Sequence, residues 1–144
     1  IENKDIPSVT LSDDLGLIEI IAGNYEGIQG SASTFTPIHM YNLKAKSGAE
    51  NTFSFPEHYT TMLLVLEGNI TINNNENVRT DHLALMEKSG ETFTVKVNDD
   101  AIVLVLSGEP INEPIAHYGP FVMNTQQELM EAVNDFNAGK FGTL

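Results

Sequence analysis

Cysteine is absent from the 144-residue sequence, which excludes disulfides, thiolate chemistry and cysteine-based zinc sites. Basic residues are scarce: seven lysines and arginines stand against 20 aspartates and glutamates, so the formal net charge is −13. Lys44 and Lys46 are the only close basic pair. Because an acidic surface repels phosphate backbones and anionic lipids, we expect no nucleic-acid partner and no membrane partner.

Long apolar runs and internal repeats are also missing. No apolar run approaches the roughly 20 residues that a membrane span requires, and the sequence shows no signal peptide, so we expect a cytoplasmic protein. The first residue is Ile rather than Met, which we interpret as a processed or truncated chain. Hydrophobic residues make up 41% of the sequence, enough for a real core, and we expect residues 1–144 to form a single domain.

Short apolar segments separated by turn residues dominate the sequence as far as residue 107. Residues 1–16 are polar and are expected to form an N-terminal arm or linker, and residues 17–107 are expected to supply the strands of a barrel. The predicted strands are 17–22, 38–45, 51–55, 61–66, 70–72, 83–86, 93–97 and 101–106. Many short strands with turns between them indicate an all-β sandwich or small barrel.

Two predicted turns decide how these strands connect. Glu-Gly-Asn at 67–69 indicates a tight hairpin between strands 61–66 and 70–72, and Asn-Asp-Asp at 98–100 indicates a turn before strand 101–106. In strand 61–66, apolar residues occupy both alternating sets of positions. We therefore expect both faces of this strand to be covered.

One amphipathic helix is predicted near the C-terminus, over residues 124–138, after a proline-rich connector at 108–123. Thr125 and Glu128 fit a capping box, and Gly139 suits the left-handed position after the last turn. Apolar side chains at 129, 133 and 136 form one stripe. A lone helix of about 14 residues is marginal in water, so the stripe is expected to dock on the barrel or on a partner.

Several short motifs occur in one order along the chain. They are IIAG at 20–23, TPI at 36–38, LLVLEGNI at 63–70, GEPINEP at 108–114, YGPFVMNT at 118–125 and GKFG at 139–142. The motif at 63–70 resembles a segment of many cupin barrels, and the set as a whole resembles the pirin family over nearly the whole chain. The resemblance implies an all-β fold, a cupin-type antiparallel β-barrel or jelly roll with one C-terminal α-helix.

Pirin-like proteins are bicupins, and the resemblance implies that this chain is the C-terminal cupin half with its connecting arm. In the family the iron site belongs to the N-terminal half, built from a His-x-His pair and a later His-x-Glu pair. The resemblance thus implies no cofactor in this chain, iron in the N-terminal half of the full-length protein, and the N-terminal cupin of the same parent chain as its partner. We expect an isolated domain to self-associate.

The four histidines lack the spacing of that iron site. Alternate residues of a strand face the same side, but the residues two positions after the histidines at 39, 58, 82 and 117 are Tyr41, Thr60, Ala84 and Gly119. His58 is the one weak metal candidate, and a site that combines His39, His58 and His82 with another donor stays open. Glu109 and Glu113 are expected to hydrogen-bond backbone amides rather than act as an acid–base pair, so no catalytic residue is predicted.

The sequence therefore predicts a non-catalytic, metal-free module that supports the metal-bearing cupin. Its predicted interface residues are Phe121, Met123, Leu129, Val133 and Phe136. Two alternatives follow from the resemblance. The chain could contribute walls around the site of a quercetin 2,3-dioxygenase-type oxidoreductase, or it could be a regulatory protein-binding cofactor, because eukaryotic pirins act as transcriptional cofactors.

Overall fold

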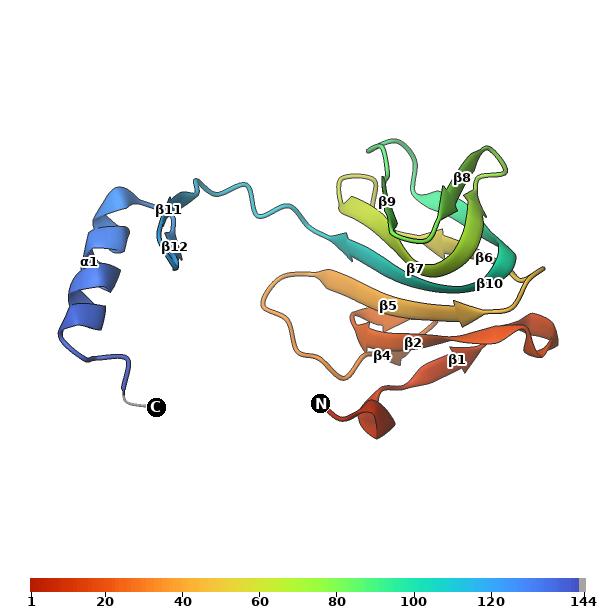
Figure 1. Ribbon diagram of the computed structural model, residues 1–144, viewed down its shortest axis with the longest axis horizontal. Helices are drawn as coiled ribbons and strands as arrows, with labels where there is room; N and C mark the ends of the chain where they lie inside the picture. The colour runs from red at the N-terminus through yellow and green to blue at the C-terminus, as the bar shows by residue number, and fades with distance from the viewer. Residues whose placement is uncertain (143–144) are drawn as a thin grey trace. The chain divides into compact units, whose positions relative to one another are not determined.

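The computed structural model describes residues 1–142 and divides into two compact units, Ile1–Pro110 and a C-terminal unit that begins at Ile111 (Figure 1). The first unit, the barrel unit, is almost entirely β-structure, with two short 3-10 turns, η1 (Asn3–Asp5) and η2 (Ser12–Asp14). Its strands are β1 (Ser8–Thr10), β2 (Gly16–Ala22), β3 (Asn24–Tyr25), β4 (Ile28–Gln29), β5 (Ile38–Ala45), β6 (Glu50–Ser54), β7 (Thr60–Ile72), β8 (Glu76–Arg79), β9 (His82–Leu85) and β10 (Thr92–Gly108).

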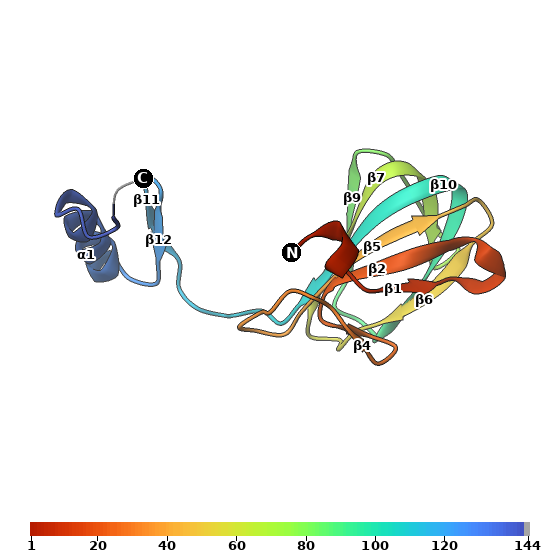
Figure 2. The same ribbon diagram turned by 90° about the horizontal axis from the view of Figure 1, so that it is seen from below.

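The main strands form one curved antiparallel sheet. Its order is β1-β2-β5-β10-β7-β8, with β6 paired to β10 and β9 paired to β7. Figure 2 shows β1, β2, β5, β10 and β7 side by side across the curved surface. Four strands, β2, β5, β6 and β9, begin and end within one residue of the predicted bounds. The all-β prediction is confirmed.

Both predicted turns, at 67–69 and 98–100, are wrong. These residues do not reverse the chain but lie inside β7 and β10, which run on for 13 and 17 residues. The pairing of the two strands shifts in register between Val97 and Val103, and Gly68 in the same region of β7 has a φ of +80°. Both strands therefore bend at the same place, and each contributes to both halves of the curved sheet.

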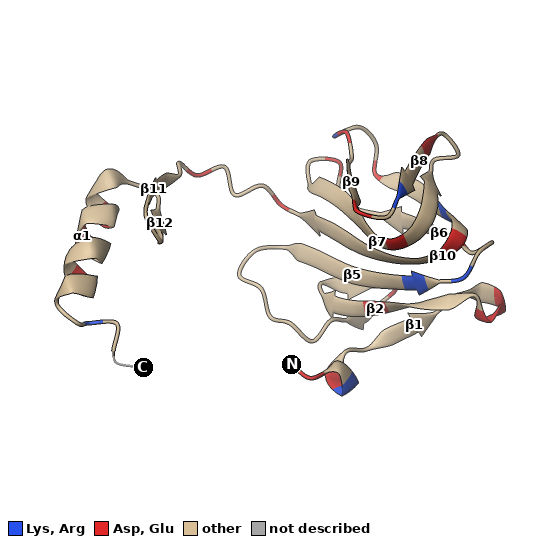
Figure 3. Ribbon diagram, in the orientation of Figure 1, with Lys and Arg blue, Asp and Glu red and all other residues tan. Residues whose placement is uncertain are grey.

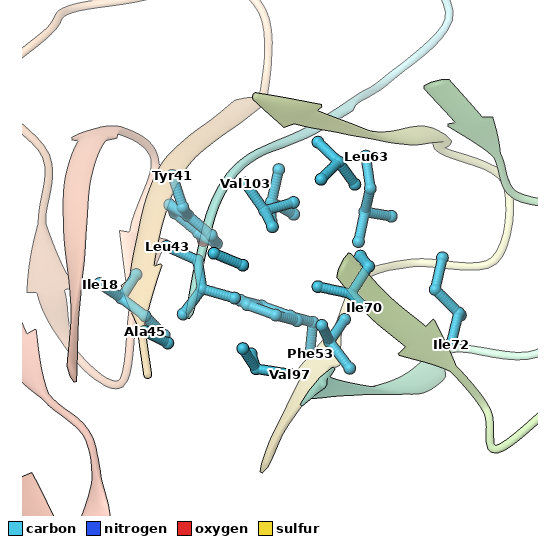
Figure 4. Packing of buried hydrophobic residues seen from close by; sticks show 14 of the residues in the cluster. Ile18, Tyr41, Leu43, Ala45, Phe53, Leu63, Ile70, Ile72, Val97 and Val103 are labelled. Atoms are coloured by element: carbon cyan, nitrogen blue, oxygen red, sulfur yellow. The ribbon is translucent and has the colours of Figure 1, made fainter. Parts of the chain in front are cut away.

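The core of the barrel unit lies between the two halves of this sheet. Alternate residues of β5, β7 and β10 point inward, and Leu63, Val65 and Val103 are completely buried. Figure 4 shows Tyr41 and Phe53 among aliphatic side chains from β2, β5, β7 and β10. A single hydrophobic core thus holds both halves together.

Several short strands lie where the sequence indicates only an arm or loops. The N-terminal arm contains β1, which pairs with β2, and β3 and β4 form a small hairpin after β2. β8 pairs with the second arm of β7 and buries Val78. These strands have two to four residues, too few for a pattern of alternation to identify them.

The C-terminal unit consists of a hairpin, β11 (Ala116–Tyr118) and β12 (Phe121–Met123), followed by α1 (Gln126–Asn137). The predicted connector thus contains two strands. The predicted capping box is confirmed: the Thr125 side chain accepts from the Glu128 N–H, and the Glu128 carboxylate accepts from the Thr125 N–H. Leu129 and Ala132 are buried, and α1 packs against the hairpin. None of the helices within residues 1–142 has the length and hydropathy of a bilayer-spanning segment.

Candidate functional site

Three polar residues lie side by side at the end of the barrel where β5 and β7 begin and β10 ends. His39 of β5 is opposite Ser107 of β10, and Ser107 is opposite Thr61 of β7. Ser107 and Thr61 are 3% and 7% exposed, and beneath them the same strands carry the apolar core. We call His39, Thr61 and Ser107 the mouth residues. They close the core with a polar layer.

Hydrogen bonds fix the side chains of this layer. Thr61 Oγ1 and Ser107 Oγ are 2.8 Å apart. The Tyr41 hydroxyl donates to the Asn24 carbonyl and lies 2.8 Å from His39 Nδ1. The hydroxyl hydrogen of Tyr41 is already donated to the Asn24 carbonyl, so the Tyr41 oxygen can only accept from His39. Nδ1 must therefore carry the hydrogen of the neutral His39 ring, which leaves Nε2 as an acceptor. Burial lowers the pKa of His39 and raises that of Tyr41, so both are neutral near neutral pH.

Aromatic rings fill the space around His39. Its ring centroid lies 5.2 Å from that of Phe55 and 6.1 Å from that of Tyr59. Further rings stack deeper in the core, at Tyr41, Phe53, Phe55 and Phe93. The hollow beside Thr61, lined in part by Phe55 and Tyr59, has a volume of about 50 Å³, which suits only a few water molecules. Aromatic rings therefore pack against His39, and the hollow beside Thr61 is too small for a substrate.

The structure does not bring the other histidines to this layer. His58 lies on the exposed turn between β6 and β7, with its ring edge-on to Tyr59 and its Nε2 3.9 Å from a carboxylate oxygen of Glu109. His82 pairs with Val65, four residues along β7 from the level of His39, or about 13 Å away. His117 belongs to β11 in the C-terminal unit. The combination of His39, His58 and His82 is therefore not assembled.

The donors at the mouth do not fit an iron site. His39 already uses Nδ1 in a hydrogen bond, and its neighbours at the same level are two hydroxyls rather than imidazoles or carboxylates. Within residues 1–142 no three His, Asp or Glu side chains are grouped closely enough to hold a metal ion. Glu113 accepts from the Asn124 side-chain amide, so its predicted bond to a backbone amide is wrong.

A second feature of the barrel unit is the apolar outer face of β5, β10, β7 and β9. The register aligns the residues of this face in rows across the strands, for example Leu104, Leu64 and Leu83. We call the following set the apolar outer face: Met40, Met62, Leu64, Leu66, Leu83, Leu85, Ile102, Leu104 and Leu106. Leu66, Leu83 and Leu85 are 45%, 55% and 67% exposed. Within the barrel unit, the prediction that both faces of strand 61–66 are covered is therefore wrong.

The outer face of the other half of the sheet, formed by β6 and the remaining arms of β7 and β10, is polar by contrast. Asn98 Nδ2 donates to Thr71 Oγ1 at 2.8 Å, and the hydroxyls of Thr52 and Thr94 lie 3.3 Å apart. Charged residues of the barrel unit gather largely at its turns and strand bends (Figure 3). One outer face thus resembles an ordinary solvated surface, while the other carries a contiguous apolar patch of the kind found at interaction sites.

A small polar network borders the apolar outer face. Asn42 of β5, opposite Leu104, donates through Nδ2 to Glu19 Oε2 at 2.7 Å, and Lys44 Nζ donates to Glu19 Oε1 at 2.7 Å. Burial opposes the charged form of Glu19, but the bonds from Lys44 and Asn42 and the lysine charge outweigh it and lower the glutamate pKa. The other amide atom, Asn42 Oδ1, is buried with no hydrogen-bond partner among residues 1–142.

The predicted interface residues all belong to the C-terminal unit. Phe121 and Met123 are partly buried in β12, and the Phe121 ring meets Phe136 at a centroid distance of 5.9 Å. Leu129 is buried, whereas Phe136 is 60% exposed. A groove of about 310 Å³ lies along α1 and is lined by Tyr118, Gln126, Leu129, Met130, Val133 and Asn134. The predicted stripe is therefore covered at Leu129 and open towards Phe136.

The family model for the pirin C-terminal cupin domain matches residues 40–142 of this chain. A Pseudomonas aeruginosa protein provisionally named as a quercetin 2,3-dioxygenase is 38% identical over 139 residues, which cover 96% of this chain and 48% of that protein. A pirin-like protein of Solanum lycopersicum is 33% identical over 143 residues, 97% of this chain and 48% of its relative. The chain spans about half the length of the curated relatives it matches.

A solved structure gives the same result at the level of fold. Quercetin 2,3-dioxygenase from Acinetobacter baumannii aligns with a TM-score of 0.92 and 43% identity, over 99% of this chain and 50% of that one. This similarity confirms the predicted cupin-type β-barrel with one C-terminal helix.

Proposed function

The chain belongs to the pirin family, as a C-terminal cupin domain related to quercetin 2,3-dioxygenase-like proteins, and we propose that it acts as a non-catalytic structural and interaction module. Its proposed partner is the N-terminal cupin of a longer parent chain, which it supports. In this proposal the parent protein binds iron, and the iron site belongs to that N-terminal half. A cytoplasmic location is part of this proposal.

The apolar outer face carries the proposal. An exposed patch of leucine, isoleucine and methionine on the outer face of one half of the sheet, while the outer face of the other half is polar, favours a protein partner of matching apolarity. The relatives that contain this segment are about twice as long, and their other half is a suitable occupant. The mouth residues, one histidine and two hydroxyls that hydrogen-bond to neighbouring groups of the barrel, support a role without chemistry of its own.

Binding to the N-terminal half of the parent protein, measured by calorimetry, tests this function. Leu85→Asp places a charge in the proposed interface and should weaken binding more than about tenfold, whereas Thr94→Asp on the polar outer face should leave binding unchanged. Purified chain should also contain far less than one equivalent of iron. Unchanged binding by Leu85→Asp, or a stoichiometric transition metal in this chain, would overturn the proposal.

A second candidate function concerns the parent protein. Relatives and a solved structure that carry the name quercetin 2,3-dioxygenase match nearly the whole chain, which favours a parent that oxidises a flavonol, with this half stabilising the catalytic cupin. Turnover of quercetin by the full-length parent, monitored by absorbance and oxygen uptake, tests it. A parent that is loaded with iron and fully folded yet leaves quercetin unchanged would exclude that activity.

A further inference from the structure

We propose that Asn42 accepts a hydrogen bond from the partner surface that covers the apolar outer face, and that the donor is a neutral side-chain hydroxyl or amide. This inference rests on the proposed function, because it assigns the chemistry of the partner at the same face. Asn42 lies directly beside Leu104 of β10, the strand between β5 and β7, and so at the edge of the face that carries the exposed leucines of β7 and β9.

The orientation of the Asn42 amide is fixed by its neighbours. Nδ2 donates to Glu19 Oε2 at 2.7 Å, and that carboxylate is held ionised by Lys44. Turning the amide over would place its oxygen against the carboxylate, which is electrostatically unfavourable. Oδ1 therefore has to point away from Glu19.

In that orientation Oδ1 has no partner. The atom is buried from solvent, and none of the described residues donates to it. Nearly all buried acceptors in proteins are paired, because a lost bond to water is otherwise not replaced. Met40 precedes Asn42 on the same side of β5, and its unbranched side chain allows the surface to rearrange around an incoming donor.

The surroundings of Asn42 select the kind of donor. Lys44 already neutralises Glu19, so a second cation would be repelled by the lysine, and a carboxylate could not donate at all. The adjacent rows on β10, β7 and β9 are apolar. A surface that carries apolar side chains and one Ser, Thr, Asn or Gln donor matches both requirements, and the N-terminal half of the parent protein is the proposed occupant.

Three substitutions test the assignment in the same binding measurement with the N-terminal half. Asn42→Leu removes Oδ1 and should raise the Kd about tenfold by leaving the donor of the partner unpaired. Glu19→Leu removes the bond that orients the amide but keeps Oδ1, and should raise the Kd by clearly less than the roughly tenfold of Asn42→Leu. Asn42→Ala serves as a second variant if the leucine disturbs the fold, which thermal melting of each variant checks.

The outcomes separate this inference from the proposed function. If Leu85→Asp abolishes binding while Asn42→Leu and Asn42→Ala bind as tightly as the unsubstituted chain, the inference is overturned and the proposed interface stands. Equal weakening by Glu19→Leu and Asn42→Leu would also overturn it, because the effect would then come from the Asn42–Glu19 contact. If Leu85→Asp leaves binding intact, the proposed function fails first and the inference with it.

Discussion

Gly68 allows β7 to bend while it stays paired with β10. Its φ is +80°, a conformation that L side chains rarely adopt. A Cβ at this position would lie 2.2 Å from the Asp100 carbonyl oxygen and 2.9 Å from Ala101 Cα. The two strands thus lie so close together where both bend that only a hydrogen atom fits between them at Gly68.

Gly68→Ala should therefore strongly destabilise the barrel. The left-handed conformation alone costs about 1–2 kcal/mol, and the clash with backbone adds about 1–3 kcal/mol. Gly48→Ala is the matched control, because Gly48 has a φ of +90° but nothing within 4 Å of the place that an added methyl group would take. Urea unfolding should show that Gly68→Ala lowers the free energy of unfolding by about 2 kcal/mol more than Gly48→Ala does. Equal losses would mean that the close approach of β7 and β10 is not tight.

His39 makes the stability of the barrel depend on pH. Burial lowers its pKa below the ordinary value of 6.5, so in acid the unfolded chain takes up a proton that the folded protein resists. The unfolded state then binds more protons, and stability falls as the pH drops below about 6.5. Glu19 affects stability at lower pH than His39 does. Because its pKa is depressed from 4.5, its contribution to the stability of the barrel is lost only in more acidic solution.

Replacing His39 by Gln should reduce this dependence. The free energy of unfolding of the unsubstituted chain should fall more than that of His39→Gln between about pH 7.5 and about pH 5.5. Urea titrations at the two pH values measure the difference. His82→Gln, at an exposed position, is the control and should follow the unsubstituted chain. Identical pH profiles for His39→Gln and the unsubstituted chain would contradict the assigned role.

Local interactions at individual residues could be predicted from the sequence, and long-range ones could not. Thr125 and Glu128 are three residues apart, so their capping box needs no knowledge of the fold. The lack of a His-x-His pair is equally local. The bond from Asn42 to Glu19 spans 23 residues and depends on the pairing of β2 with β5, which no sequence pattern specifies.

The helix α1 and its hairpin stabilise each other. Leu129 is 3% exposed, while its neighbour Met130 is 67% exposed. The hairpin could not be predicted because β11 and β12 have three residues each and lie in a segment rich in proline, where sequence favours an irregular connector. The helix was predictable because its cap and apolar stripe are both local signals.

Leu129→Asp should unfold the C-terminal unit, because it buries a charge in a very small apolar contact. Met130→Asp should leave the unit folded, since the side chain is exposed. Far-ultraviolet circular dichroism and limited proteolysis after Ile111 distinguish the two. Retention of the helical signal by Leu129→Asp would show that this residue is not the anchor of α1.

The predicted turns inside β7 and β10 failed for a physical reason. Glu-Gly-Asn is a strong hairpin signal when a strand ends, but a glycine with positive φ also permits a bulge when the partner strand bends with it. Which outcome occurs depends on the partner, and residues 98–100 of β10 bend at the matching position. The existence of strands at these positions was therefore predictable, while the continuity of β7 and β10 was not.

The barrel unit as a whole has one outer face suited to water and one suited to a partner. Sequence analysis could find the alternating apolar residues of 61–66 and 101–106, but not that their outer sides share a face with Leu83 and Leu85. The predicted interface was therefore restricted to residues 121–136. The exposed leucines of β7 and β9 add a larger candidate surface.

Self-association of the isolated chain is expected from this exposed surface, even though a net charge of −13 opposes it. Sedimentation at rising protein concentration should show a shift to higher mass, stronger at high salt because salt screens the repulsion. Leu83→Asp should abolish the shift, and Thr52→Asp on the polar outer face should not. A chain that stays monomeric across the whole range would contradict the prediction.

The continuous strands β7 and β10 also bear on how the barrel opens and folds. Each pairs with strands in both halves of the curved sheet, so neither half can separate without breaking bonds in the other. Their contacts are distant in sequence, as the Thr61–Ser107 bond across 46 residues illustrates, and such a high contact order is associated with folding on the order of milliseconds to seconds. The amides of β7 and β10 in the regularly paired segments on either side of the bend should exchange with deuterium only through global unfolding, which makes these segments the slowest-exchanging part of the protein.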